Sequence, residues 1–321
     1  MTLTIVSMLI SFVFALLSGV AYISFLNKKL YHQHILEEAP ENHKKKAGTP
    51  TTGGVFLVVS TVFASILALI MAQTATERAF VALLTFVFFT FAGFLDDFQK
   101  ISKKQNKGIT PRTKLGLQIG ISLLPVLYML LHSDTSVNFF GYNFELGVLY
   151  AAFALFVIVG VSNAVNLTDG LDGLAASNSI VAFLACAFVC LATKNIDLAI
   201  ISSATAGACL GFLYFNKYPA KVFMGDTGSL ALGGLLATIA LLGKFEIFLI
   251  FIGIIFMLET LSVMLQVTSF KLTGKRIFKM SPIHHHFELC GWSEVKIVIV
   301  FTLVTLISSL IGVKLFLMSL N

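Results

Sequence analysis

Charged residues are scarce in this chain of 321 residues. Only 12% of them are Asp, Glu, Lys or Arg, whereas 57% are apolar. An ordinary soluble domain carries about 25% charged residues. The composition therefore excludes a soluble globular domain and predicts a polytopic membrane protein.

Cysteine is also scarce, with four residues in the chain. Cys186, Cys190 and Cys209 lie inside apolar segments, and Cys290 has no Cys near it. This spacing predicts neither a disulfide framework nor a zinc site. A basic soluble domain with interleaved aromatic residues is absent as well, so we expect no nucleic-acid partner.

Ten apolar segments are long enough, or nearly long enough, to span a bilayer as helices. They are 3–26, 54–72, 79–95, 115–132, 147–165, 174–193, 197–215, 228–243, 246–270 and 295–318. The third and the eighth are short, which leaves their polar ends at the hydrocarbon edge. We predict an all-α polytopic membrane protein of one domain over residues 1–321, with a small hairpin at 133–145.

Lysine and arginine predict the orientation, because they accumulate in cytoplasmic loops. The loops that follow the odd-numbered spans hold 18 of the 22 Lys and Arg residues. Both termini are therefore expected outside, with five polar cytoplasmic loops that form the active site. The first span has basic residues after it rather than before it, which favours a retained helix over a cleaved signal peptide.

Two carboxylates, Asp169 and Asp172, occupy the polar segment 163–174 between two spans. They are three residues apart, so they share a face if the segment forms a helical turn. No Lys or Arg lies within ten residues of them, and unpaired charge at a membrane edge indicates function. The alternative is an ordinary acidic turn in water.

A second acidic site, Asp96 and Asp97, ends the third span. The end of a helix already carries partial negative charge, so adjacent acids there require a cation. Neighbouring helical residues point about 100° apart, so one carboxylate is free to face a ligand while the other faces the protein. The alternative is a solvated pair balanced by nearby lysines.

A third acidic site, Asp226, lies between two glycines in Phe-Met-Gly-Asp-Thr-Gly-Ser at 223–229, just before the eighth span. Thr227 and Ser229 are candidates to cap that helix, and a helix N-terminus favours phosphate. The alternative is that Asp226 is itself the cap. Carboxylates from three loops suit Mg²⁺, which takes one or two of them together with phosphates and water.

Basic residues and histidines accompany these acids. Lys46 precedes a Gly/Thr-rich turn at 48–54 and is a candidate phosphate ligand, whereas topology explains Lys100 and its neighbours better than catalysis does. His284, His285 and His286 are consecutive, so they cannot all face one ion on a helix. They are candidates to hydrogen-bond a nucleotide.

Glu259 lies deep in the ninth span. Its position there favours the interpretation that it has a structural role rather than a place in a pathway through the membrane.

These motifs together resemble the phospho-N-acetylmuramoyl-pentapeptide transferase family, within the polyprenyl-phosphate N-acetylhexosamine-1-phosphate transferase superfamily. The resemblance covers nearly the whole chain. It is carried by Phe-Leu-Asp-Asp at 94–97, Asn-Leu-Thr-Asp-Gly-Leu-Asp-Gly at 166–173, the 223–229 segment and Ser-Pro-Ile-His-His-His-Phe-Glu at 281–288. Thr52 stands where many relatives carry Met.

The resemblance implies an enzyme of the bacterial cytoplasmic membrane that is magnesium-dependent and dimeric. Its substrates would be UDP-N-acetylmuramoyl-pentapeptide and undecaprenyl phosphate, and its products lipid I and UMP. The implied catalytic residues are Asp96, Asp97, Asp226, Lys46 and His284, with Asp226 as the metal ligand. The implied substrate-binding residues are Lys104, Lys114, Asn166, Asp169, Asp172, Asn216, Phe223 and His285.

Two other functions stay open at this stage. A related transferase would use UDP-N-acetylglucosamine as the donor. A secondary transporter for an anionic solute would place ionisable groups near the bilayer centre, often within inverted repeats. Nearly all the acids here flank the spans, and no internal repeat is visible. The sequence therefore favours the transferase.

Overall fold

A computed structural model describes residues 2–29, 48–103, 107–139 and 141–320. Within them, ten helices are long and apolar enough to cross a membrane, which confirms the predicted all-α polytopic fold. They are α1 (Thr2–Lys29), α3 (Gly54–Ala72), α4 (Glu77–Ser102), α5 (Pro111–His132), α6 (Leu149–Thr168), α7 (Leu174–Ala192), α8 (Ile196–Asn216), α9 (Gly225–Leu242), α11 (Ile254–Thr273) and α13 (Glu294–Ser319).

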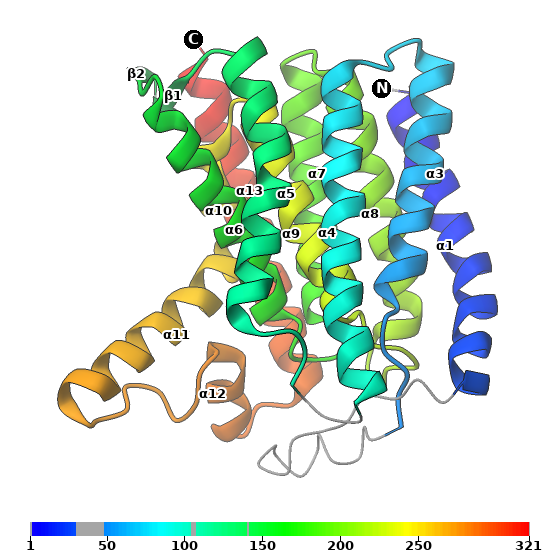
Figure 1. Cartoon of the computed structure of the whole chain (residues 1–321), viewed down its shortest axis with the longest axis vertical. Coiled ribbons are helices and arrows are strands. Elements are labelled where there is room, and N and C mark those ends of the chain that lie inside the picture. Colours follow the sequence, from blue (N-terminus) through cyan, green and yellow to red (C-terminus); the bar gives the residue numbers. More distant parts are fainter. Residues whose placement is uncertain (1, 30–47, 104–106, 140, 321) are drawn as a thin grey trace.

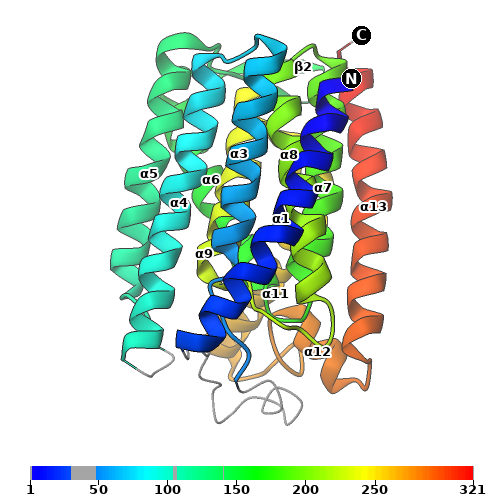
Figure 2. The same ribbon diagram turned by 90° about the vertical axis from the view of Figure 1, so that its right-hand side faces the viewer.

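Helices α8 and α9 form the interior of the bundle. Helix α8 packs against α1, α3 and α7, while α9 packs against α4 and α6 (Figures 1 and 2). Small residues make this packing possible. A Cβ atom on Gly233 of α9 would lie 2.5 Å from the Val161 carbonyl oxygen of α6. The middle of α9 is thereby held among other helices rather than in lipid.

The third span is longer than predicted. The sequence indicated a short helix at 79–95, but α4 continues to Ser102. The polar segment after Phe94 stays helical, and Lys100 pairs with Asp96 one turn earlier at 2.6 Å. Hydropathy detects only the apolar part of such a helix. The prediction of a short third span was therefore wrong, whereas the eighth span, α9, is short at 18 residues.

The ninth span is broken. In place of one helix over 246–270, the chain forms a 3₁₀ turn η1 (Glu246–Phe248), a short helix α10 (Leu249–Ile252) and then α11. Gly253 separates α10 from α11. Figure 1 shows α11 leaning away from the bundle, so its later turns stand apart from the other helices.

The predicted hairpin at 133–145 is confirmed. Strands β1 (Ser136–Phe139) and β2 (Tyr142–Glu145) pair in antiparallel fashion, with Ser136 opposite Glu145. The hairpin and both chain termini lie at one end of the bundle, and the short helix α12 (Ile283–Leu289) lies at the other (Figure 1). An even number of spans requires this arrangement of the termini. Which compartment each end faces stays a prediction.

Candidate active site

Three carboxylates converge where the end of α4 meets the start of α9. Oxygen atoms of Asp96, Asp97 and Asp226 all lie within 4.8 Å of one another. Gly93 allows this approach, because a Cβ atom there would lie 2.1 Å from the Asp226 carbonyl oxygen. The tertiary fold therefore joins two of the three predicted acidic sites.

The Asp97 carboxylate accepts hydrogen bonds from other residues of the protein. Its carboxylate accepts hydrogen bonds from the Asp226 N–H at 3.1 Å, the Thr227 N–H at 2.9 Å and the Thr227 hydroxyl at 2.6 Å. It thus satisfies the open N–H groups at the start of α9, where negative charge is favourable. The expectation that Thr227 or Ser229 caps α9 was wrong. The Thr227 hydroxyl donates to Asp97, and that of Ser229 donates to the Gly225 carbonyl oxygen at 2.9 Å.

Asp96 faces the loop that leads into α5. Its Oδ1 accepts a hydrogen bond from the Ile109 N–H at 3.0 Å, and its Oδ2 lies 2.6 Å from the Lys100 ammonium. A Cβ atom on Gly108 would meet the same carboxylate at 2.3 Å. The two adjacent acids therefore face different surroundings, as the helical geometry predicts.

Asp226 has cationic and amide partners from three helices. Its Oδ2 accepts from Lys114 of α5 at 2.6 Å. Its Oδ1 accepts from the Asn166 amide of α6 at 3.0 Å and lies 3.3 Å from the Lys100 ammonium of α4. Lys114 and Asn166, both predicted site residues, are thus brought to the carboxylate cluster.

Lys100 is a site residue that the sequence analysis did not select. Its ammonium contacts Asp96 and Asp226 and lies 3.7 Å from Asp97, so it stands among all three carboxylates. Two lysines therefore face three acids, and a negative charge remains for a further cation. The signal available in the sequence was the four-residue spacing from Asp96 to Lys100, which places both side chains on one helix face.

The acidic segment at 163–174 divides between two environments. Burial raises the pKa of Asp169 well above its usual value, and the nearby Asp226 and Asp97 carboxylates add to the rise. Asp169 is therefore electrostatically part of the cluster. Asp172 instead accepts a hydrogen bond from the Ala220 N–H at 2.9 Å, so it holds the loop after α8 in place.

Asn216 and Phe223 connect loops beside the cluster. The Asn216 side chain accepts from the Gly173 N–H at 3.0 Å and donates to the Val222 carbonyl at 2.9 Å. The Phe223 N–H donates to the Pro50 carbonyl at 2.8 Å, which brings the Gly/Thr-rich turn against this segment. Lys46, a predicted phosphate ligand, and Lys104, a predicted substrate-binding residue, lie outside the described residues.

The three consecutive histidines have three different surroundings. His284 is buried beside Glu259, with its Nδ1 at 3.1 Å from the carboxylate. His285 Nδ1 lies 2.7 Å from Glu288 of the same helix, and His286 Nδ1 accepts from the Lys279 N–H at 3.1 Å. The trio does not converge on one point, as expected from consecutive positions on a helix.

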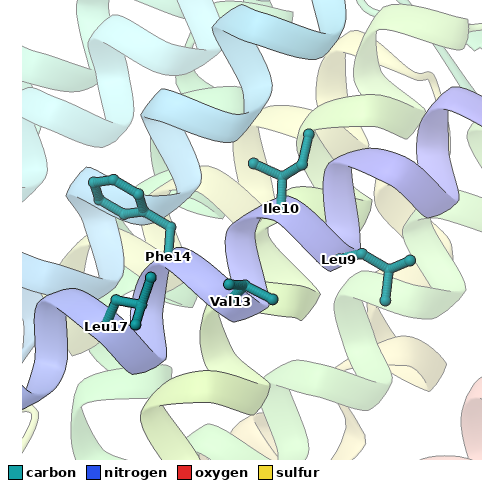
Figure 3. Close-up of a pocket in the computed structure, with 5 residues that line it drawn as sticks. All are labelled: Leu9, Ile10, Val13, Phe14 and Leu17. Carbon is teal, nitrogen blue, oxygen red and sulfur yellow. The ribbon is translucent and has the colours of Figure 1, made fainter.

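A shallow hollow on α1 has no part in this site. It is lined by Leu9, Ile10, Val13, Phe14 and Leu17, all of them apolar (Figure 3). Phe14 stacks on Phe63 of α3 with ring centroids 4.7 Å apart. Leu9, Val13 and Leu17 are exposed on the outer surface of the bundle, which is the surface expected to face lipid.

Comparison with known proteins shows which family the whole chain resembles. Residues 79–244 match glycosyl transferase family 4. The chain is 47% identical over 309 residues to the phospho-N-acetylmuramoyl-pentapeptide-transferase of Clostridium beijerinckii, covering 95% of this chain and 94% of the relative. It is 48% identical to that of Clostridium perfringens over 94% of this chain and 95% of the relative. It is 47% identical to that of Shouchella clausii over 95% of both chains. The chain therefore belongs to the phospho-N-acetylmuramoyl-pentapeptide transferases, within glycosyl transferase family 4.

Proposed function

We propose that this chain transfers phospho-N-acetylmuramoyl-pentapeptide from UDP to undecaprenyl phosphate, which yields lipid I and UMP in the first membrane step of peptidoglycan synthesis. The chain is a multi-pass protein of the bacterial cytoplasmic membrane, as its ten apolar helices and its relatives indicate. The observation that carries the proposal is the cluster of Asp96, Asp97 and Asp226 with two lysines at one end of the bundle.

The cluster fits a magnesium ion. All its donors are carboxylate oxygens, which Mg²⁺ prefers, and Mg²⁺ usually keeps positions for water and substrate phosphate. Asp97 is engaged by the start of α9. We therefore assign Asp226 and Asp96 as the residues that would hold the ion. When bound, the ion would neutralise charge on the diphosphate of the donor.

The reaction breaks one phosphorus–oxygen bond and forms another. An oxygen of the lipid phosphate attacks the sugar-bearing phosphorus, and UMP leaves with the bridging oxygen. Lys100 and Lys114 stand at the cluster and would stabilise the charge on the phosphoryl oxygens. A phosphomonoester has a second pKa of about 6, so alignment of the acceptor matters more than a general base. Asp96 is the candidate if a base acts.

Access to the site follows from the chemistry of the two substrates. The lipid phosphate is held at the membrane surface by its apolar tail, and the nucleotide arrives from water. We therefore assign the cytoplasm to the end of the bundle that carries the carboxylates, which also agrees with the distribution of Lys and Arg. The homodimer and the nucleotide contacts of His284, His285, Asp169 and Lys46 remain parts of this proposal.

Purified protein tests the proposal directly. It would be incubated with undecaprenyl phosphate, magnesium or a chelator, and either UDP-N-acetylmuramoyl-pentapeptide or UDP-N-acetylglucosamine. We expect release of UMP from the first donor only, and only with magnesium. Efficient transfer from UDP-N-acetylglucosamine would assign the chain to the alternative donor. Absence of UMP release from both donors would contradict a transferase.

A further inference from the structure

Glu259 is a buried acid that the proposed reaction does not use. It lies on α11, and its side chain is fully buried. A buried carboxylate is costly unless a cationic or hydrogen-bonding partner compensates it. The partner here is His284 of α12, which is 1% exposed.

Two contacts join this pair. Glu259 Oε1 lies 3.1 Å from His284 Nδ1, and Glu259 Oε2 accepts from the His284 backbone N–H at 3.4 Å. The Nδ1 contact is close without being well aligned, because neither atom completes a hydrogen bond within the described residues. Hydrogen bonds of active sites are often loose before substrate binds.

The other end of the imidazole ring faces the acidic loop. His284 Nε2 lies 2.3 Å from the position that a Cβ atom on Gly170 would take. Gly170 follows Asp169 and precedes Asp172, so the ring abuts the loop next to the carboxylate cluster. Within the part of the chain that the structure describes, Nε2 is buried and has no hydrogen-bond partner.

We infer that Glu259 is a positioning residue that keeps the proton of neutral His284 on Nδ1 and leaves Nε2 as a hydrogen-bond acceptor toward the acidic loop. A carboxylate beside one ring nitrogen favours a proton on that nitrogen, and the other nitrogen then accepts. The acceptor suits an N–H or O–H group of the nucleotide sugar. The identity of the ligand rests on the proposed function. The contacts between Glu259 and His284 do not depend on it.

The first test reads the tautomer without any activity. The chain contains seven histidines, so protein labelled with ¹⁵N-histidine gives a tractable spectrum, and His284→Gln identifies the signals of His284. We expect neutral His284 to carry its proton on Nδ1 in the wild-type protein. Glu259→Gln should change this tautomer, whereas Thr260→Val should not. Thr260 is a matched control because, within the described residues, its hydroxyl donates to the Phe256 carbonyl of its own helix, at 3.1 Å.

The second test measures coupling between the two residues. Glu259→Gln should lower kcat/KM for the donor by about tenfold, the value of one hydrogen bond. The double variant with His284→Gln should be no slower than His284→Gln alone, because a residue that acts through another adds nothing once that other is removed. If the losses of kcat/KM in the two single variants multiply in the double variant, the inference is overturned.

The two tests separate the inference from the proposed function. A neutral wild-type His284 protonated on Nε2 would overturn the inference even if Glu259→Gln fails to fold. Wild-type protein that releases no UMP would contradict the proposed function, yet the ¹⁵N spectra would still decide the role of Glu259.

Discussion

The ammonium of Lys100 lies 2.6 Å from Asp96 Oδ2 and 3.3 Å from Asp226 Oδ1, between the two carboxylates assigned to the metal. Mg²⁺ binds oxygen at about 2.1 Å. An ion held by these carboxylates would add positive charge beside the ammonium, and like charges at close range repel. Lys100 thus serves as the counter-cation of the cluster, and a divalent ion held by Asp96 and Asp226 would compete with its charge.

Replacing Lys100 should strengthen binding of a divalent ion in the absence of substrates. Lys100→Met removes the competing charge and keeps an apolar stem of similar length. We expect affinity for Mn²⁺, measured by calorimetry, to rise on the order of tenfold, which corresponds to about 1.4 kcal/mol. Lys103→Met is the control, because Lys103 is exposed at the end of the same helix. Unchanged or weaker Mn²⁺ binding by Lys100→Met would contradict competition at the cluster.

Asp226→Asn should abolish magnesium-dependent release of UMP. The amide keeps the shape of the side chain but removes the charge that faces Lys100 and Lys114. We expect turnover to fall at least about a hundredfold, as for loss of a charge-stabilising group in an active site. The protein should still elute as a folded species in detergent. Near-normal turnover would remove Asp226 from the metal site.

Asp97→Asn should destabilise the protein more than Asp96→Asn does. Both residues are 3% exposed. Asp97 accepts three hydrogen bonds at the start of α9, and an amide turns one of its acceptors into a donor facing other donors. We expect a loss of about 2 kcal/mol for Asp97→Asn, measured as a lower unfolding midpoint in detergent. Equal midpoints for the two variants would contradict a structural role for Asp97.

Glu246 should make stability depend on pH. Its carboxylate lies 3.9 Å from the ammonium of Lys244, which also donates to the hairpin at the end of the bundle opposite the site. Burial raises the pKa of Glu246 from 4.5 to about 7. The folded state then binds more protons than the unfolded state between these values, so stability falls as pH rises from about 4.5 to 7 and levels above that range. The loss is at most about 3 kcal/mol.

The comparison with Glu246→Gln isolates this contribution. The amide cannot ionise, so the unfolding midpoint of the variant should rise relative to wild type as the pH increases from 5 to 8. Other titrating groups contribute equally to both proteins. Parallel pH profiles would show that the Glu246 carboxylate is already ionised at pH 5.

Hydropathy predicted the spans well, but only where apolar residues themselves form the helix. Hydropathy did not predict the C-terminal end of α4 or the break at Gly253, and the reason is the same for both. Asp96 to Ser102 stay helical although they are polar, and η1, α10 and α11 are apolar although they do not form one helix. Polarity reports where a segment lies relative to lipid, not where its backbone hydrogen bonds stop.

The sequence by itself determined that this chain crosses the membrane about ten times and that its acids flank the spans, because both follow from the length and order of apolar runs. Only the tertiary structure decided what each acid does. Asp97 accepts hydrogen bonds from the start of α9, and Asp226 forms ion pairs with Lys100 and Lys114. Lys100 lies among the carboxylates because α4 and α9 pack closely at Gly93. These contacts join residues more than a hundred positions apart, so they depend on how the helices pack. Local patterns in the sequence do not predict that packing.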